Sequence, residues 1–123
     1  MQKTSPDLKQ VTPDELQLGE DHLDFLKNLK HPTQINIKGD DHSRCRAIVT
    51  LLHGNEPYGV KAIYRLLKNN IKPATDLTVI IASVNTALQT PILSQRFLPW
   101  ESDMNRCFKQ PYTGNQGALA QAI

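Results

Sequence analysis

The chain has 123 residues, of which 39% are hydrophobic, and its net charge of +2 comes from 14 basic and 12 acidic residues. That length suits one small domain or part of one, and the scattered charges give no sign of a nucleic-acid groove or a polybasic membrane patch. No stretch approaches the roughly 18 consecutive apolar residues of a membrane span, so we expect no membrane or nucleic-acid partner.

The cysteine count and the N-terminus bear on localisation. The two cysteines, Cys45 and Cys107, cannot form a dense disulfide framework. The polar residues 1–10 lack the apolar stretch of a signal peptide. We therefore expect a cytoplasmic protein.

Residues 1–33 are predicted to form a peripheral helical segment. The run from Thr12 to Glu15 has the form of a capping box with Pro13 at the first helical position. Apolar residues at helical spacing then predict a helix near residues 20–30. Residues 34–38 alternate in polarity and predict an edge strand, which a polar cluster at residues 39–42 would end in a turn.

Two continuous apolar runs rich in β-branched residues, at 47–52 and 77–84, predict strands that are buried on both faces, as in a parallel sheet. Helical spacing of apolar residues predicts a helix between them, over about 60–67. The unit is therefore strand, helix, strand, and we predict an α/β fold. Ligands of open α/β sheets bind beyond the carboxyl ends of the strands, where His53 lies.

The stretch at 86–117 has no clear periodicity, and a loop of that length in a compact domain is usually functional or disordered. Residues 117–123 have the composition of a helix that has just started, with no stop signal. We infer that the sequence is an N-terminal piece of a longer protein.

His53 and Glu56 stand three residues apart on the turn that follows the first apolar run. An imidazole and a carboxylate at that spacing can reach one cation, since Gly54 lets the backbone bend and Pro57 suits the first turn of a helix. A catalytic zinc usually has three protein ligands, and this motif provides two. A histidine at a strand end can also be a structural residue with hydrogen-bonded ring nitrogens.

The long loop contains a second polar group, formed by Arg96, Asn105 and Arg106. Guanidinium groups bind carboxylates through paired hydrogen bonds, so these residues favour a substrate with an acidic end. The alternative is that the arginines are solvated or paired with Glu101 and Asp103.

In chain order these motifs resemble the succinylglutamate desuccinylase and aspartoacylase family of the zinc carboxypeptidase-like group. The resemblance covers about residues 47–108, and it rests on His53-Gly54-Asn55-Glu56-Pro57, Asn85, Arg96-Phe97 and Asp103-Met104-Asn105-Arg106. Two departures from the family pattern, a longer interval before Asp103 and Thr86 in place of a proline, concern the substrate side of the site.

The resemblance implies a zinc-carboxypeptidase-like mixed sheet with flanking helices, of which this chain is the N-terminal part. Residues 34–123 would hold the sheet, the metal motif and the substrate loop. It implies one Zn²⁺ held by His53 and Glu56, a substrate carboxylate held by Arg96, and Asn105 and Arg106 in the substrate-binding stretch. The third zinc ligand and the general base would lie beyond residue 123, so the piece itself would be inactive.

The function that follows is a zinc-dependent hydrolase of amide bonds, which removes the acyl group from N-acylated acidic amino acids or related small carboxylates. One alternative is a zinc carboxypeptidase that acts on peptides or cell-wall fragments. Another is a binding or regulatory module without enzymatic activity.

Overall fold

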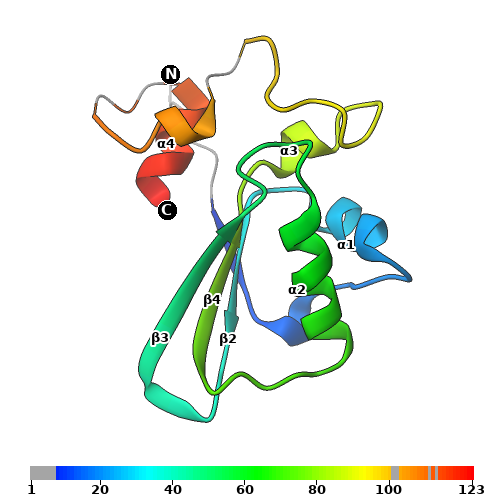
Figure 1. The fold of residues 1–123 in the computed structure, drawn as a ribbon, viewed down its shortest axis with the longest axis vertical. Coiled ribbons are helices and arrows are strands. Elements are labelled where there is room, and N and C mark those ends of the chain that lie inside the picture. The colour runs from blue at the N-terminus through cyan, green and yellow to red at the C-terminus, as the bar shows by residue number, and fades with distance from the viewer. Residues whose placement is uncertain (1–7, 101–102, 111, 113) are drawn as a thin grey trace.

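The computed structural model describes residues 8–100, 103–110, 112 and 114–123 as a mixed α/β fold (Figure 1). The strands are β1 (Lys9–Val11), β2 (Thr33–Ile37), β3 (Asp41–Thr50) and β4 (Thr75–Ile81). The helices are α1 (His22–Leu29), α2 (Tyr58–Lys68), α3 (Val84–Ala87) and α4 (Gly114–Ala122), with short 3-10 helices η1 (Pro13–Glu15) and η2 (Met104–Arg106). The predicted α/β class is confirmed.

The described strands form one four-stranded sheet in the order β1-β2-β4-β3. β1 is parallel to β2, β2 is antiparallel to β4, and β3 is parallel to β4. The unit β3-α2-β4 is the predicted strand-helix-strand unit. The prediction that residues 34–38 form an edge strand is wrong, because β1 pairs with β2 on its outer side; β1 has three residues, too few to give a periodic signal.

The core lies between the sheet and the helices α1 and α2, which cover the same face (Figure 1). Phe25 and Leu26 of α1 are fully buried there, together with Val60 of α2 and with Ile35 and Val79 of the sheet. The side chain of Asp21 caps α1 by accepting a hydrogen bond from the N–H of Asp24. The segment predicted to be peripheral therefore contributes a strand and two central core residues.

Strand β3 is the other edge of the sheet, and its burial differs from the prediction. The apolar run in its second half was predicted to be buried on both faces, but Ile48 is 42% exposed and Val49 37%. These two side chains point to opposite faces of the sheet, so each face of the strand is only partly covered. The prediction is wrong because, among the described strands, β3 pairs with β4 alone.

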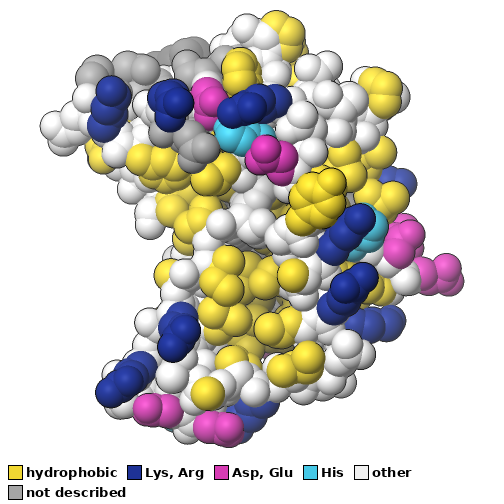
Figure 2. All heavy atoms as spheres, viewed as in Figure 1, with side chains coloured by type: hydrophobic (Ala, Val, Ile, Leu, Met, Phe, Trp, Pro, Cys, Tyr) yellow, Lys and Arg dark blue, Asp and Glu magenta, His cyan; other side chains and the backbone are white. Residues whose placement is uncertain are grey.

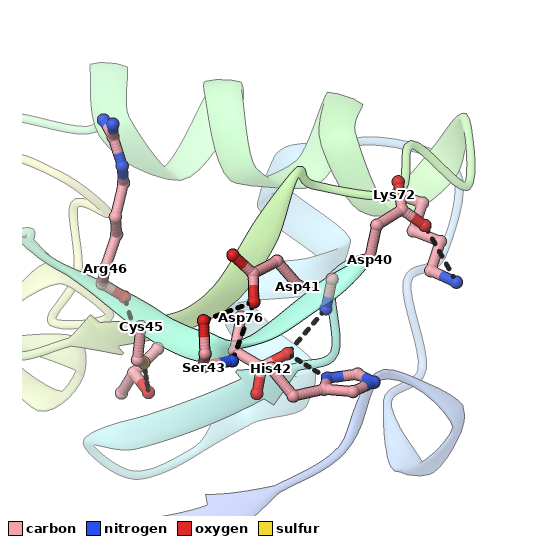
Figure 3. Close-up of polar contacts among 10 residues, drawn as sticks. Asp40, Asp41, His42, Ser43, Cys45, Arg46, Lys72 and Asp76 are labelled. Carbon is pink, nitrogen blue, oxygen red and sulfur yellow. Dashed lines mark hydrogen bonds and ion pairs between the residues drawn. The ribbon is translucent and has the colours of Figure 1, made fainter.

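Asp76 organises the turn between β2 and β3 (Figure 3). One carboxylate oxygen of Asp76 accepts a hydrogen bond from the N–H of Gly39 at 2.8 Å and lies 2.8 Å from Nδ1 of His42. The hydrogen bond from Gly39, followed by that of His42, lowers the pKa of Asp76. The turn is short, since β3 begins at Asp41, within the cluster predicted to be the turn.

The C-terminal part packs as a second, smaller cluster at the carboxyl end of β4. Ala82, Met104, Leu119 and Ala120 are its buried members. The helix predicted from residue 117 starts at Gly114, and β4 ends at Ile81 rather than at residue 84. Within the described ranges, the helices are all too short or too polar to cross a bilayer.

Candidate metal centre

His53 lies on the turn that joins β3 to α2. Leu51 begins this turn with a left-handed backbone, at φ 57°, which is rare for a branched side chain and directs the chain out of the strand. The N–H of Glu56 then donates a hydrogen bond to the carbonyl of His53 at 3.2 Å. The turn buries the imidazole, which is 4% exposed, at the predicted end of the strand.

Gly54 is required by a close approach of two chain segments. Its N–H donates to the carbonyl of Arg96 at 2.9 Å. A Cβ atom at this position would lie 2.6 Å from the carbonyl oxygen of Gln95 and 3.0 Å from the amide of Ala87. The glycine is therefore needed because the loop that carries Arg96 lies against the motif, and the left-handed residue of this turn is Leu51 rather than Gly54.

Both ring nitrogens of His53 face a carboxylate. Nδ1 lies 3.0 Å from Oε2 of Glu56, and Nε2 lies 2.8 Å from Oδ1 of Asp103. The second oxygen of Asp103 accepts a hydrogen bond from the guanidinium of Arg96 at 3.3 Å. The four side chains are linked in the order Glu56, His53, Asp103, Arg96, and we call them the His53 network.

Only a doubly protonated imidazole can donate a hydrogen bond on both sides. Burial by itself lowers the pKa of His53, but the hydrogen bonds to Asp103 and Glu56 and the charge of Asp103 together raise it by more, so the pKa lies above its usual value. In the absence of a metal the His53 network therefore favours the imidazolium.

The predicted substrate residues are brought together only in part. Arg96 belongs to the His53 network, and its side chain remains 54% exposed. Arg106 is exposed, and its backbone N–H donates to the carbonyl of Asp103 at 2.9 Å in η2. The backbone of Asn105 belongs to η2, whereas its side chain lies outside what the structure describes, as does Glu101.

The described residues contain no group of three His, Cys, Asp or Glu side chains that could hold a metal ion together. The geometry explains this, because Glu56 and Asp103 lie on the two different nitrogens of one ring and cannot converge on one point. Two atoms can share an ion, namely Nδ1 of His53 and Oε2 of Glu56. Their separation of 3.0 Å is close to the distance of about 3.3 Å between two ligands of a tetrahedral zinc.

The role of Asp103 was not predicted from the sequence. In the sequence it is the first residue of the Asp-Met-Asn-Arg stretch and a possible partner of an arginine, but its bond to His53 spans 50 residues of sequence. A chemical rule could have pointed to a carboxylate such as Asp103, since a histidine that binds a metal usually donates its other N–H to a carboxylate.

Comparison of the chain with protein-family models, with curated proteins and with solved structures finds no match.

Proposed function

We propose that the chain is the metal-binding part of a zinc-dependent hydrolase that cleaves amide bonds in N-acylated acidic amino acids or related small carboxylates. The observation that carries the proposal is the His53 network. In it a buried imidazole presents Nδ1 beside the Glu56 carboxylate, and its Nε2 lies beside the Asp103 carboxylate. This is the arrangement of a metal-binding histidine with its orienting carboxylate.

In this proposal His53 and Glu56 hold the zinc ion. Asp103 accepts the Nε2–H of His53, which fixes the tautomer that has a lone pair on Nδ1 and keeps the ring in place. Because the pKa of His53 is raised, the proton on Nδ1 has to leave before the metal binds, and metal binding releases it.

Arg96 supports the substrate side of the proposal. One of its terminal nitrogens donates to Asp103, and its exposed side chain keeps other N–H groups directed to solvent, where a substrate carboxylate can bind. Arg106 is a second exposed cation within the same stretch. Zinc held by His53 and Glu56 would supply a nucleophilic water near neutral pH and would polarise the amide carbonyl.

The first test is metal binding by the 123-residue chain, measured by calorimetric titration with zinc. Since His53 and Glu56 are only two of the three ligands of a catalytic zinc, we expect weak binding of one zinc ion per chain, and weaker binding still by His53→Ala and by Asp103→Asn. His31→Ala is the control, since it removes an exposed histidine far along the chain from the motif. Unchanged zinc affinity in His53→Ala would contradict the proposal.

The second test uses N-acetylaspartate and N-succinylglutamate as probes of the acidic site. We expect zinc-dependent binding to the chain, weakened by Arg96→Gln, without turnover, because His53 and Glu56 are two of the three ligands that a catalytic zinc usually has. Binding that is the same with and without zinc would contradict a metal-centred site.

A specific observation also favours a second candidate, a binding module without catalysis. His53 is buried and both of its ring nitrogens have partners, which is what a histidine that holds a loop in place needs. In that case zinc would leave the unfolding curve of the chain unchanged, whereas a zinc site predicts that zinc raises the free energy of unfolding.

A further inference from the structure

Ser83, which lies beyond the carboxyl end of β4, holds the backbone that leads into the turn of His53. The N–H of Ser83 donates a hydrogen bond to the carbonyl of Leu51 at 2.8 Å. The hydroxyl of Ser83 donates to the carbonyl of Leu52, also at 2.8 Å. Figure 2 shows acidic, basic and histidine side chains gathered over the turn that follows. One residue thus binds both carbonyls that directly precede His53.

The hydroxyl of Ser83 is not used in the way its position in the chain suggests. Ser83 stands at the N-cap of α3, where a serine hydroxyl usually accepts a hydrogen bond from the first turn of its own helix. Among the described residues, no such bond to α3 is formed. The hydroxyl instead donates to a carbonyl 31 residues earlier in the chain. This side chain therefore serves the turn that carries His53 rather than the helix that it precedes.

The backbone conformation that Ser83 holds is one that the chain does not adopt easily. Leu51 has a left-handed backbone, at φ 57°, which is uncommon for a residue other than glycine. In a regular strand successive carbonyls point to opposite sides, yet those of Leu51 and Leu52 are both bound by Ser83. Such a conformation persists only where the surrounding contacts fix it, and Ser83 provides two of these contacts.

The hydrogen bond to Leu52 bears directly on the imidazole. The carbonyl of Leu52 lies in the same peptide plane as the N–H of His53, so a bond to it fixes the direction in which the ring leaves the backbone. The carbonyl of His53 accepts from the N–H of Glu56 at 3.2 Å, which holds the next peptide plane. The ring nitrogens lie 2.8 and 3.0 Å from the carboxylates of Asp103 and Glu56. A small rotation of the backbone would break both contacts.

We propose that Ser83 is a positioning residue for the metal centre. Through the carbonyls of Leu51 and Leu52 it holds the imidazole of His53 where Nδ1 can bind zinc while Nε2 meets Asp103. The purpose of this hold rests on the proposed function, whereas the hold itself is a property of the metal-free chain. Every hydrogen bond involved joins two described residues, so no further strand or partner is needed to form it.

The first measurement follows the ring signals of His53 by NMR, in the metal-free 123-residue chain labelled with ¹⁵N. The proton between Nε2 and Asp103 reports the contact between them in the folded state. Ser83→Ala should shift this signal toward that of a freely solvated ring, because the imidazole is no longer held in one direction. Ser83→Thr keeps the hydroxyl and should restore the signal of the parent. Amide spectra establish that each variant remains folded.

The second measurement is a zinc titration followed at the same ring signals. Ser83→Ala should bind zinc about 3- to 10-fold more weakly than the parent, the factor that corresponds to the net loss of one hydrogen bond. A loss of stability alone does not change the zinc affinity of a chain that stays folded. The matched control is Ser43→Ala, which removes a hydrogen bond to Asp41 at the other end of β3 and should leave both readouts unchanged.

Two outcomes would overturn the proposal. One is a Ser83→Ala variant with the ring signals and the zinc affinity of the parent. The other is an equal change in Ser43→Ala, because the effect would then be general to the fold. A parent chain in which zinc does not affect the His53 ring would contradict the proposed function instead, and the metal-free ring signals would then decide by themselves whether Ser83 holds the imidazole.

Discussion

β3 and β4 are parallel neighbours with similar apolar, β-branched sequences, and their burial is opposite. In β4, Val79 and Ile81 are fully buried, whereas Ile48 and Val49 in β3 are 42% and 37% exposed. The difference comes from sheet order, since β4 has a strand on each side and helices over one face, and β3 has a single neighbour among the described strands. Composition alone therefore does not tell how deeply a strand is buried.

The same isoleucine-to-alanine change in the two strands gives the largest expected contrast. Ile81→Ala should lower the free energy of unfolding by about 2–5 kcal/mol, because it leaves a cavity in the core. Ile48→Ala should cost about 1 kcal/mol or less, since its side chain is already partly in water. Urea denaturation of both variants measures the difference, and equal losses would show that the β3 face is covered in solution.

A smaller effect on stability is expected at Gly54, in the turn that follows β3. This glycine is buried, although most of the strand is exposed. Gly54→Ala should lower the free energy of unfolding by about 1–3 kcal/mol, since the new Cβ meets the carbonyl of Gln95. Asn55→Ala, at the exposed neighbouring position, is the matched control and should change it by about 0.5 kcal/mol or less. Urea denaturation of both variants measures the difference. Similar losses of stability would contradict the close approach of Gly54 to the carbonyl of Gln95.

The smallest expected effect is a dependence of stability on pH at this turn. The folded-state pKa of His53 is raised, so its contribution to stability is fully present below the pKa of the unfolded chain and is lost as the pH rises through the folded-state pKa. The metal-free parent should therefore lose stability from slightly acidic to slightly alkaline pH by more than His53→Ala does. Parallel pH profiles of the two proteins would contradict the imidazolium between Glu56 and Asp103.

Local signals account for the elements that were predicted correctly. The apolar spacing of α1 and α2, the apolar runs of β3 and β4, and the position of His53 and Glu56 after β3 are all properties of short segments. The three-residue strand β1 and the interior place of β2 could not be found this way, because strand neighbours are chosen by contacts between distant segments.

The same distinction between local signals and contacts of distant segments applies to the candidate site. His53 and Glu56 are three residues apart, so their proximity follows from one turn. The contact of His53 with Asp103 and the contact of Gly54 with Arg96 depend on how the long loop folds back over the carboxyl end of β3.

By itself the sequence determined the α/β class, the strand-helix-strand unit and the pairing of His53 with Glu56, because each of these depends on periodicity or on residues within one turn. Only the tertiary structure decided that β3 is an edge among the described strands and that Asp103 lies on the second nitrogen of His53. Both depend on which distant segments meet, and loop closure over 50 residues leaves no periodic signal in the sequence.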